Sequence, residues 1–188
     1  MIKKRGQVVV DKILDTAGRL FYEQGYDATG INQVIEEADI ARGSLYKHFE
    51  SKADLLVAYL ERLHDQWFEK YEADIAAIAD PKAKLLAVFD HHIQRQEARG
   101  YGGCPFIKAN LEAGANDPRV SAEIQRNKQR LKDFLKRLVA HSGHGKLLSD
   151  SELAETIYLL IEGGVTAGSV FKQAADLQAA KKIIKKLI

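Results

Sequence analysis

Apolar residues recur along this chain at the three-to-four-residue spacing of amphipathic helices. From Val9 to Phe21 they fall on one helical face, and the pattern ends at Gly25, a residue type common at helix C-termini. No segment shows the sustained alternation of apolar and polar residues that marks a half-buried strand. The pattern therefore predicts an all-α protein.

Helix start signals recur through the rest of the chain. Asp80–Pro81 and Asp117–Pro118 each combine a capping residue with a proline at the first helical position. Ser51–Asp54 and Ser149–Glu152 fit the capping-box pattern. Together these signals predict about nine helices.

Two short helical segments follow the first helix. We expect Thr29 to cap one of them, and the other carries Leu45 and Phe49 toward the interior. Only a few residues separate the two segments, which is typical of a helix-turn-helix. We therefore predict a helix-turn-helix DNA-binding domain over residues 1–52, running into a connecting helix. Residues 53–188 would form a larger helical domain.

The second short helix carries side chains suited to the major groove of DNA. Leu45 and Phe49 would anchor it from behind, Gly43 would permit close backbone approach, and the polar residues between would reach phosphates or base edges. Lys52 and Thr29 would each contact a phosphate at the start of a helix. The predicted DNA-binding residues are Thr29, Arg42, Gly43, Ser44, Tyr46, Lys47, His48 and Lys52.

Charge and composition limit how the chain could bind DNA and in which compartment it would work. The net charge of +2 is too small for nucleic-acid binding through bulk charge, and residues 1–52 hold eight basic and eight acidic side chains. DNA affinity would therefore depend on where individual side chains are placed, and the basic cluster Lys3–Arg5 would act as an additional DNA-binding arm. The single cysteine excludes an internal disulfide and favours the cytoplasm. Glu155 and Glu162 interrupt the most apolar stretch, which argues against a membrane helix.

The segment from Val9 to Tyr59 resembles the N-terminal domain of TetR/AcrR-type transcriptional regulators. The most specific matches are Gly43–Tyr46, His48–Phe49 and Ser51–Lys52, and further matches upstream are Leu20, Phe21, Gly25, Tyr26 and Thr29. The resemblance implies an all-helical homodimer, usually a repressor. Such a protein binds a palindromic operator and is released when its C-terminal domain binds a small molecule.

The turn before the recognition helix departs from the family pattern of Gly-Val followed by Ser or Thr. Here it reads Asp39, Ile40, Ala41. Asp can adopt the left-handed conformation that a glycine would take. Ala41 is a poor N-cap and its side chain cannot bind a phosphate, so it is not among the predicted DNA contacts. Lys47, at a position that varies among relatives, is the best candidate for a sequence-dependent contact.

The stretch Ala98–Gly114 resembles a Gly-Cys-Pro/Leu motif found in one branch of the family. Glycines and a proline flank Cys104, which predicts a turn that opens a new helix. A helix start and a nearby cation favour a reactive thiolate, so Cys104, Lys108 and Lys172 form a predicted thiol sensor for oxidants or electrophiles. The alternative, more usual for a lone cysteine, is a small buried hydrophobic residue.

Four aromatic residues are predicted to border an effector pocket: Trp67, Phe89, Phe106 and Tyr158. His64 is expected to face solvent or the domain seam. His91 and His92 should point to different helix faces, and two histidines in a loop make no zinc site, so no metal or cofactor is predicted. The last segment, Ala179–Ile188, should pack on the helical bundle.

The favoured function is a ligand- or redox-responsive DNA-binding regulator, most often a repressor. It would be a homodimer through the helices near 117–140 and 151–172. One alternative is an enzyme with Cys104 as nucleophile and His91 or His92 as base, although no triad signature is present. Another is a helical adaptor that binds protein.

Overall fold

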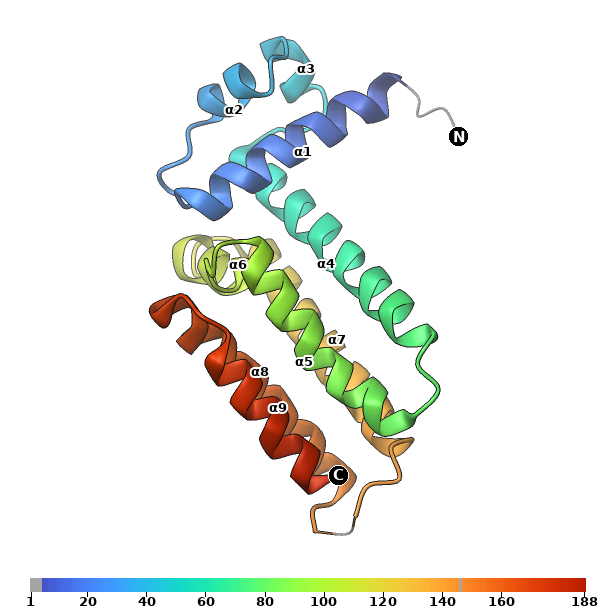
Figure 1. Cartoon of the computed structure of the whole chain (residues 1–188). Coiled ribbons are helices and arrows are strands. Elements are labelled where there is room, and N and C mark those ends of the chain that lie inside the picture. Colours follow the sequence, from blue (N-terminus) through green and yellow to red (C-terminus); the bar gives the residue numbers. More distant parts are fainter. Residues whose placement is uncertain (1–4, 146) are drawn as a thin grey trace. The chain divides into compact units, whose positions relative to one another are not determined.

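Within the described residues, 5–145 and 147–188, every regular element of this computed structural model is helical (Figure 1). The prediction of an all-α protein with about nine helices is confirmed. The elements are α1 (Arg5–Glu23), α2 (Ile31–Glu37), α3 (Arg42–Tyr46), α4 (Lys52–Ala76), α5 (Pro81–Ala98), α6 (Pro105–Ala109), the π-helical turn η1 (Asn110–Gly114), α7 (Pro118–Ala140), α8 (Asp150–Phe171) and α9 (Ala175–Leu187). The proposed arm Lys3–Arg5 lies largely outside the described residues.

The predicted helix start signals are present. The Asp80 carboxylate accepts a hydrogen bond from the backbone N–H of Ala83 at 2.8 Å, ahead of the proline that opens α5. Ser149 and Glu152 form the complete capping box of α8. These bonds satisfy N–H groups that have no partner inside the helix, which is why the sequence places the helix starts well.

The chain folds into two compact units. The first contains the described residues up to Asp65 together with Pro105–Gln125, and the second contains Gln66–Cys104 and Arg126–Ile188. This grouping differs from the predicted division after residue 52, because the first unit includes the start of α4 and a segment from the middle of the chain.

In the first unit, α1 supplies one side of a helical core. Its buried face includes Ile13, Leu20 and Phe21, as the sequence pattern predicts. The Phe21 ring meets the Tyr59 ring of α4 edge-on, with centroids 6.2 Å apart. Gly25 follows α1 with a φ of 98°, as expected of a residue that ends a helix.

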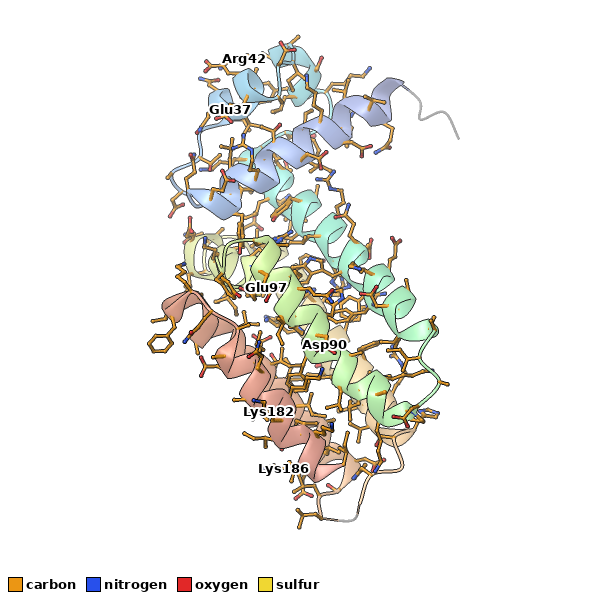
Figure 2. All side chains as sticks on the ribbon, in the orientation of Figure 1. Glu37, Arg42, Asp90, Glu97, Lys182 and Lys186 are labelled. Carbon is orange, nitrogen blue, oxygen red and sulfur yellow. The ribbon has the colours of Figure 1, made fainter. Side chains whose placement is uncertain are left out.

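The second unit is a helical bundle. Its core joins apolar faces of α4, α5, α7, α8 and α9. Helix α9 packs against α5 and α8 through Leu177, Ala180 and Ile184, so the expectation that the last segment packs on the bundle is confirmed. Lys182 and Lys186 lie on the exposed face of α9 (Figure 2). No helix of the described chain is both long and apolar enough to span a membrane.

Candidate functional site

Helix α3 is short, and the interior of the first unit fixes it from behind. Leu45 is fully buried and Phe49 nearly so, which confirms their predicted anchoring role. Asp39 has a φ of 47°, so it adopts the left-handed turn conformation expected of it. Ala41 is the N-cap of α3 and makes no side-chain capping bond. The turn and the anchors therefore present α3 outward.

The outer side of α3 and the turn after it carries the predicted polar side chains. Arg42, Gly43, Lys47 and His48 are exposed, and Tyr46 is 45% exposed. Ser44, which completes the predicted set on this helix, is half-buried.

Arg42 is held by a neighbour that the sequence analysis missed. Its Nη2 donates a hydrogen bond of 2.6 Å to Oδ1 of Asn32, an exposed residue of α2. The two residues are ten positions apart in different helices, so no local pattern signals this pair.

Thr29 does not cap α2, so that prediction is wrong. Gly30 is the N-cap, while Thr29 is fully buried and its hydroxyl donates to the Gly25 carbonyl at 2.6 Å. The Thr29 side chain is thus used inside the unit and presents no group to a phosphate. The buried position reflects the close packing of the loop against α1.

Lys52 also makes internal contacts. Its ammonium donates to the carbonyls of Tyr26 at 2.9 Å and Thr29 at 3.1 Å, and it lies 4.2 Å from the centroid of the Tyr26 ring. Lys52 therefore fastens the start of α4 to the loop before α2, and its contact with a DNA phosphate stays a prediction.

The segment Pro105–Gln125 contacts the helix-turn-helix at three points. Lys108 donates to the Tyr22 carbonyl at 2.5 Å, the Glu112 carboxylate accepts from the Asp27 N–H at 2.9 Å, and Arg119 pairs with Asp54. The Arg119 charge and hydrogen bond help to lower the pKa of Asp54, after the larger effect of the Ser51 hydroxyl.

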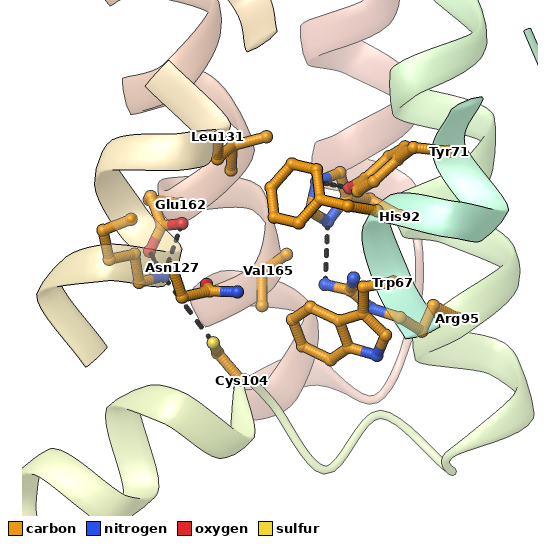
Figure 3. Close-up of a pocket in the computed structure, with 11 residues that line it drawn as sticks. Trp67, Tyr71, His92, Arg95, Cys104, Asn127, Leu131, Glu162 and Val165 are labelled. Atoms are coloured by element: carbon orange, nitrogen blue, oxygen red, sulfur yellow. Dashed lines mark hydrogen bonds and ion pairs between the residues drawn. The ribbon is translucent and has the colours of Figure 1, made fainter. Parts of the chain in front are cut away.

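A narrow cavity lies in the second unit (Figure 3). Of the four predicted pocket residues only Trp67 lines it. Phe89 is fully buried in the core of the bundle, Phe106 is fully buried in the first unit, and Tyr158 lies beneath the Lys132 ammonium instead. The lining residues are Trp67, Phe68, Tyr71, His92, Arg95, Cys104, Asn127, Lys128, Leu131, Glu162 and Val165.

Cys104 lines this cavity and immediately precedes α6, so the predicted turn at a helix start is confirmed. Its neighbouring cation is Lys128, whose Nζ lies 3.6 Å from Sγ. Lys108 and Lys172 are therefore the wrong partners: Lys108 is bound to Tyr22, and Lys172 donates to the Tyr101 carbonyl at 3.2 Å. Contacts between distant helices decide this pairing, so spacing along the chain could not predict it.

His91 and His92 are both buried, and their rings lie beside the Tyr71 ring with centroids 4.0 Å and 5.7 Å away. Nδ1 of His91 lies 2.9 Å from the Asp74 carboxylate, and Nε2 of His92 lies 2.5 Å from the Tyr71 hydroxyl. Burial lowers the pKa of His91 and lowers that of His92 well below its ordinary value, so both favour the neutral form.

His64 is buried as well, with its Nδ1 3.4 Å from a carboxylate oxygen of Glu123, so of its two expected positions the one facing solvent is excluded. In the described part of the chain, no group of three or more His, Cys, Asp or Glu side chains is arranged to hold a metal ion.

Comparisons with known proteins agree with this architecture. Residues 13–59 match the family model described as "Bacterial regulatory proteins, tetR family", and residues 81–184 match "Tetracyclin repressor-like, C-terminal domain". The second match alone covers more than half of the chain. The chain belongs to the tetR family. The resemblance inferred from the recognition segment is thus confirmed.

Among curated tetR-family relatives, the fatty acid metabolism regulator protein of Bacillus subtilis is 31% identical over 81 residues, covering 43% of this chain and 42% of the relative. The transcriptional repressor KstR2 of Mycobacterium tuberculosis is 29% identical over 121 residues, covering 64% and 60%. The chain thus spans roughly two fifths to three fifths of the length of such relatives.

The crystal structure of reduced NemR from E. coli has a TM-score of 0.84 at 17% identity, covering 96% of this chain and 97% of that one. At this identity the likeness concerns the fold. The family and these relatives are transcriptional regulators, so the enzyme alternative built on Cys104 is set aside.

Proposed function

We propose that this chain is a ligand-responsive transcriptional repressor of the cytoplasm that binds a palindromic DNA operator as a homodimer. The observation that carries the proposal is the exposed outer side of α3, which is anchored by Leu45 and Phe49 inside a helix-turn-helix of the tetR family. Each subunit would place α3 in one of two successive major grooves.

Two side chains are best suited to contact DNA. The side chains of Tyr46 and Lys47 are exposed and have no hydrogen-bond partner among the described residues. They retain their full capacity to donate to phosphates or base edges. Arg42 would contact DNA in an orientation set by Asn32. Gly43 would allow the backbone of α3 to approach the DNA closely, and His48 would lie at the edge of the contact.

An exposed apolar stripe supports dimerisation through α8 and the neighbouring α7. Leu159, Gly163, Thr166 and Val170 are all exposed and follow one another at helical spacing, with Phe171 at the end of the helix. Leu159 is 59% and Val170 68% exposed. Exposed apolar patches of this kind mark association surfaces, and the open Gly163 would permit close approach of a partner helix.

The cavity is the proposed effector site. Helix α4 contributes Trp67, Phe68 and Tyr71 to its wall, and the same helix begins at Lys52 against the helix-turn-helix. Cys104 leads directly into the segment that contacts the helix-turn-helix. A ligand that binds more tightly to the conformation unable to bind DNA would shift the population toward that conformation. Helix α4 and the segment after Cys104 would connect the cavity to the helix-turn-helix.

The direct test is fluorescence anisotropy with a labelled duplex from upstream of the protein's own gene, over a salt series. Wild type should bind tightly and lose affinity as salt rises. Tyr46→Ala with Lys47→Ala should lose binding, whereas Lys182→Ala, which removes an exposed lysine of α9, should not. Absence of binding at low salt would contradict the proposal and favour the protein-binding adaptor.

A second candidate is regulation by oxidation, favoured by the 3.6 Å approach of Lys128 to Cys104 inside the cavity. Hydrogen peroxide would oxidise the Cys104 thiol to the sulfenic acid, with water as the other product. Peroxide should then release wild type from DNA, reductant should restore binding, and Cys104→Ser should stay bound. Equal release of the variant would assign Cys104 to a packing role.

A further inference from the structure

The charges lining the cavity do not balance. Lys128 pairs with Glu162, with its Nζ 2.7 Å and 2.6 Å from the two carboxylate oxygens, and the same Nζ lies 3.6 Å from the Cys104 Sγ. Those two charges neutralise each other. The remaining charged side chain is Arg95, and no carboxylate among the described residues lies within ion-pair distance of it. The cavity therefore carries one uncompensated positive charge.

Arg95 is placed by its neighbours but not satisfied by them. Its guanidinium stacks on the Trp67 ring at 3.3 Å from the centroid, and its Nη2 lies 3.2 Å from Nδ1 of His92 (Figure 3). Its Nη1 is shielded from solvent and has no hydrogen-bond partner in the part of the chain that the structure describes. An unpaired buried cationic donor is costly, so a bound anion would relieve this cost.

The same contacts leave a second donor free. Because a guanidinium only donates, Nδ1 of His92 must be the acceptor and the proton of the neutral ring lies on Nε2. Nε2–H then donates to the Tyr71 oxygen. The Tyr71 hydroxyl stays protonated, since burial raises its pKa. Its own proton has no acceptor among the described residues.

We propose that Arg95 and Tyr71 form the binding site for the carboxylate of a small organic acid, with the apolar body of the acid against Trp67, Phe68, Leu131 and Val165. The proposal names the ligand class for the effector cavity and so rests on the proposed function. An apolar body is required because these four residues form much of the remaining wall. A neutral ligand could accept hydrogen bonds from these donors but would leave the charge of Arg95 uncompensated.

The test uses cyclohexanecarboxylate and hexanoate as probes, each compared with its neutral amide. Trp67 is the only tryptophan of the chain, and these probes do not absorb where it is excited, so its emission reports binding directly. Each acid should bind wild type at least tenfold more tightly than its amide. Arg95→Gln should lose that preference, Tyr71→Phe should reduce it, and Arg137→Gln, an exposed arginine of α7, should keep it.

Equal affinity of wild type for acid and amide would overturn the proposal, and this result needs no variant. The proposal would also fail if neither acid changed Trp67 emission at millimolar concentration. An acid preference that persists in folded Arg95→Gln would also overturn it. Operator binding measured on the same preparations separates the two claims. Protein that binds DNA but not acids refutes the ligand class alone, and protein that binds acids but not DNA refutes the repressor alone.

Discussion

The ammonium group of Lys52 donates to the Tyr26 carbonyl and lies over the Tyr26 ring, so the first residue of α4 holds the loop that leads into α2. In the sequence this lysine has the position of a phosphate ligand. In the structure it also sets where the helix-turn-helix meets the connecting helix. A phosphate contact and an internal structural contact of Lys52 predict different effects of substituting this residue.

Lys52→Met should destabilise the protein by about 1–2 kcal/mol, because it removes two hydrogen bonds and a cation–π contact. Urea unfolding measures this change. Lys47→Met should cost less than about 0.5 kcal/mol, because the exposed Lys47 side chain has no partner among the described residues. If Lys52→Met keeps its stability but lowers the salt dependence of DNA binding, Lys52 is a phosphate ligand after all.

Lys47→Ala should weaken operator binding and reduce the slope of log affinity against log salt by about 1, as expected for the loss of one phosphate contact. If Lys47 instead reads a base, the loss will vary among operator variants at a single position. Anisotropy titrations at four salt concentrations distinguish these outcomes. Lys182→Ala should leave the slope unchanged, and an equal change there would point to non-specific charge.

Val170→Asp should convert the proposed dimer to a monomer, since it places a charge in the exposed apolar stripe of α8. Analytical ultracentrifugation measures the oligomeric state, and operator affinity should fall with it. Ile183→Asp tests another exposed apolar residue, on α9, and should stay dimeric. A dimer that survives Val170→Asp would place the interface elsewhere.

Gly18→Ala should destabilise the first unit by about 1–3 kcal/mol, because a Cβ there would overlap the buried Tyr59 ring. Gly6→Ala is the matched control in the same helix, since nothing lies within 4 Å of its added Cβ. Thermal unfolding of both variants provides the comparison. Similar stabilities would show that Tyr59 yields without cost.

Stability should fall as the pH drops below about 6.5. Burial, aided by the charges of Arg95, His91 and Lys128, lowers the pKa of His92 below its unfolded value, so the unfolded chain binds the proton more readily. The stabilisation is fully present above the unfolded pKa and is lost toward lower pH, by up to about 1.4 kcal/mol per pH unit for each such histidine.

Urea unfolding at pH 7.5, 6.5 and 5.5 measures this loss. His92→Gln should be less stable at pH 7.5 but should show a shallower dependence on pH. Identical slopes for wild type and His92→Gln would mean that His92 does not titrate on unfolding.

The sequence alone determined the helices, their starts and the recognition segment. Capping bonds such as that of Asp80 and anchors such as Leu45 act over three or four residues, so local pattern is sufficient to predict them. The left-handed turn at Asp39 was predictable for the same reason.

Tertiary structure decided the cavity and the partners of its polar groups. Lys128 lies beside Cys104 although 24 residues separate them, and Asn32 meets Arg42 across two helices. Aromatic residues at helical spacing look alike in sequence whether they fill a core, as Phe89 does, or line a cavity, as Trp67 does. The physical reason is that the packing of helices distant in sequence decides which buried side chains line a cavity. Helical periodicity shows only that a side chain faces the interior.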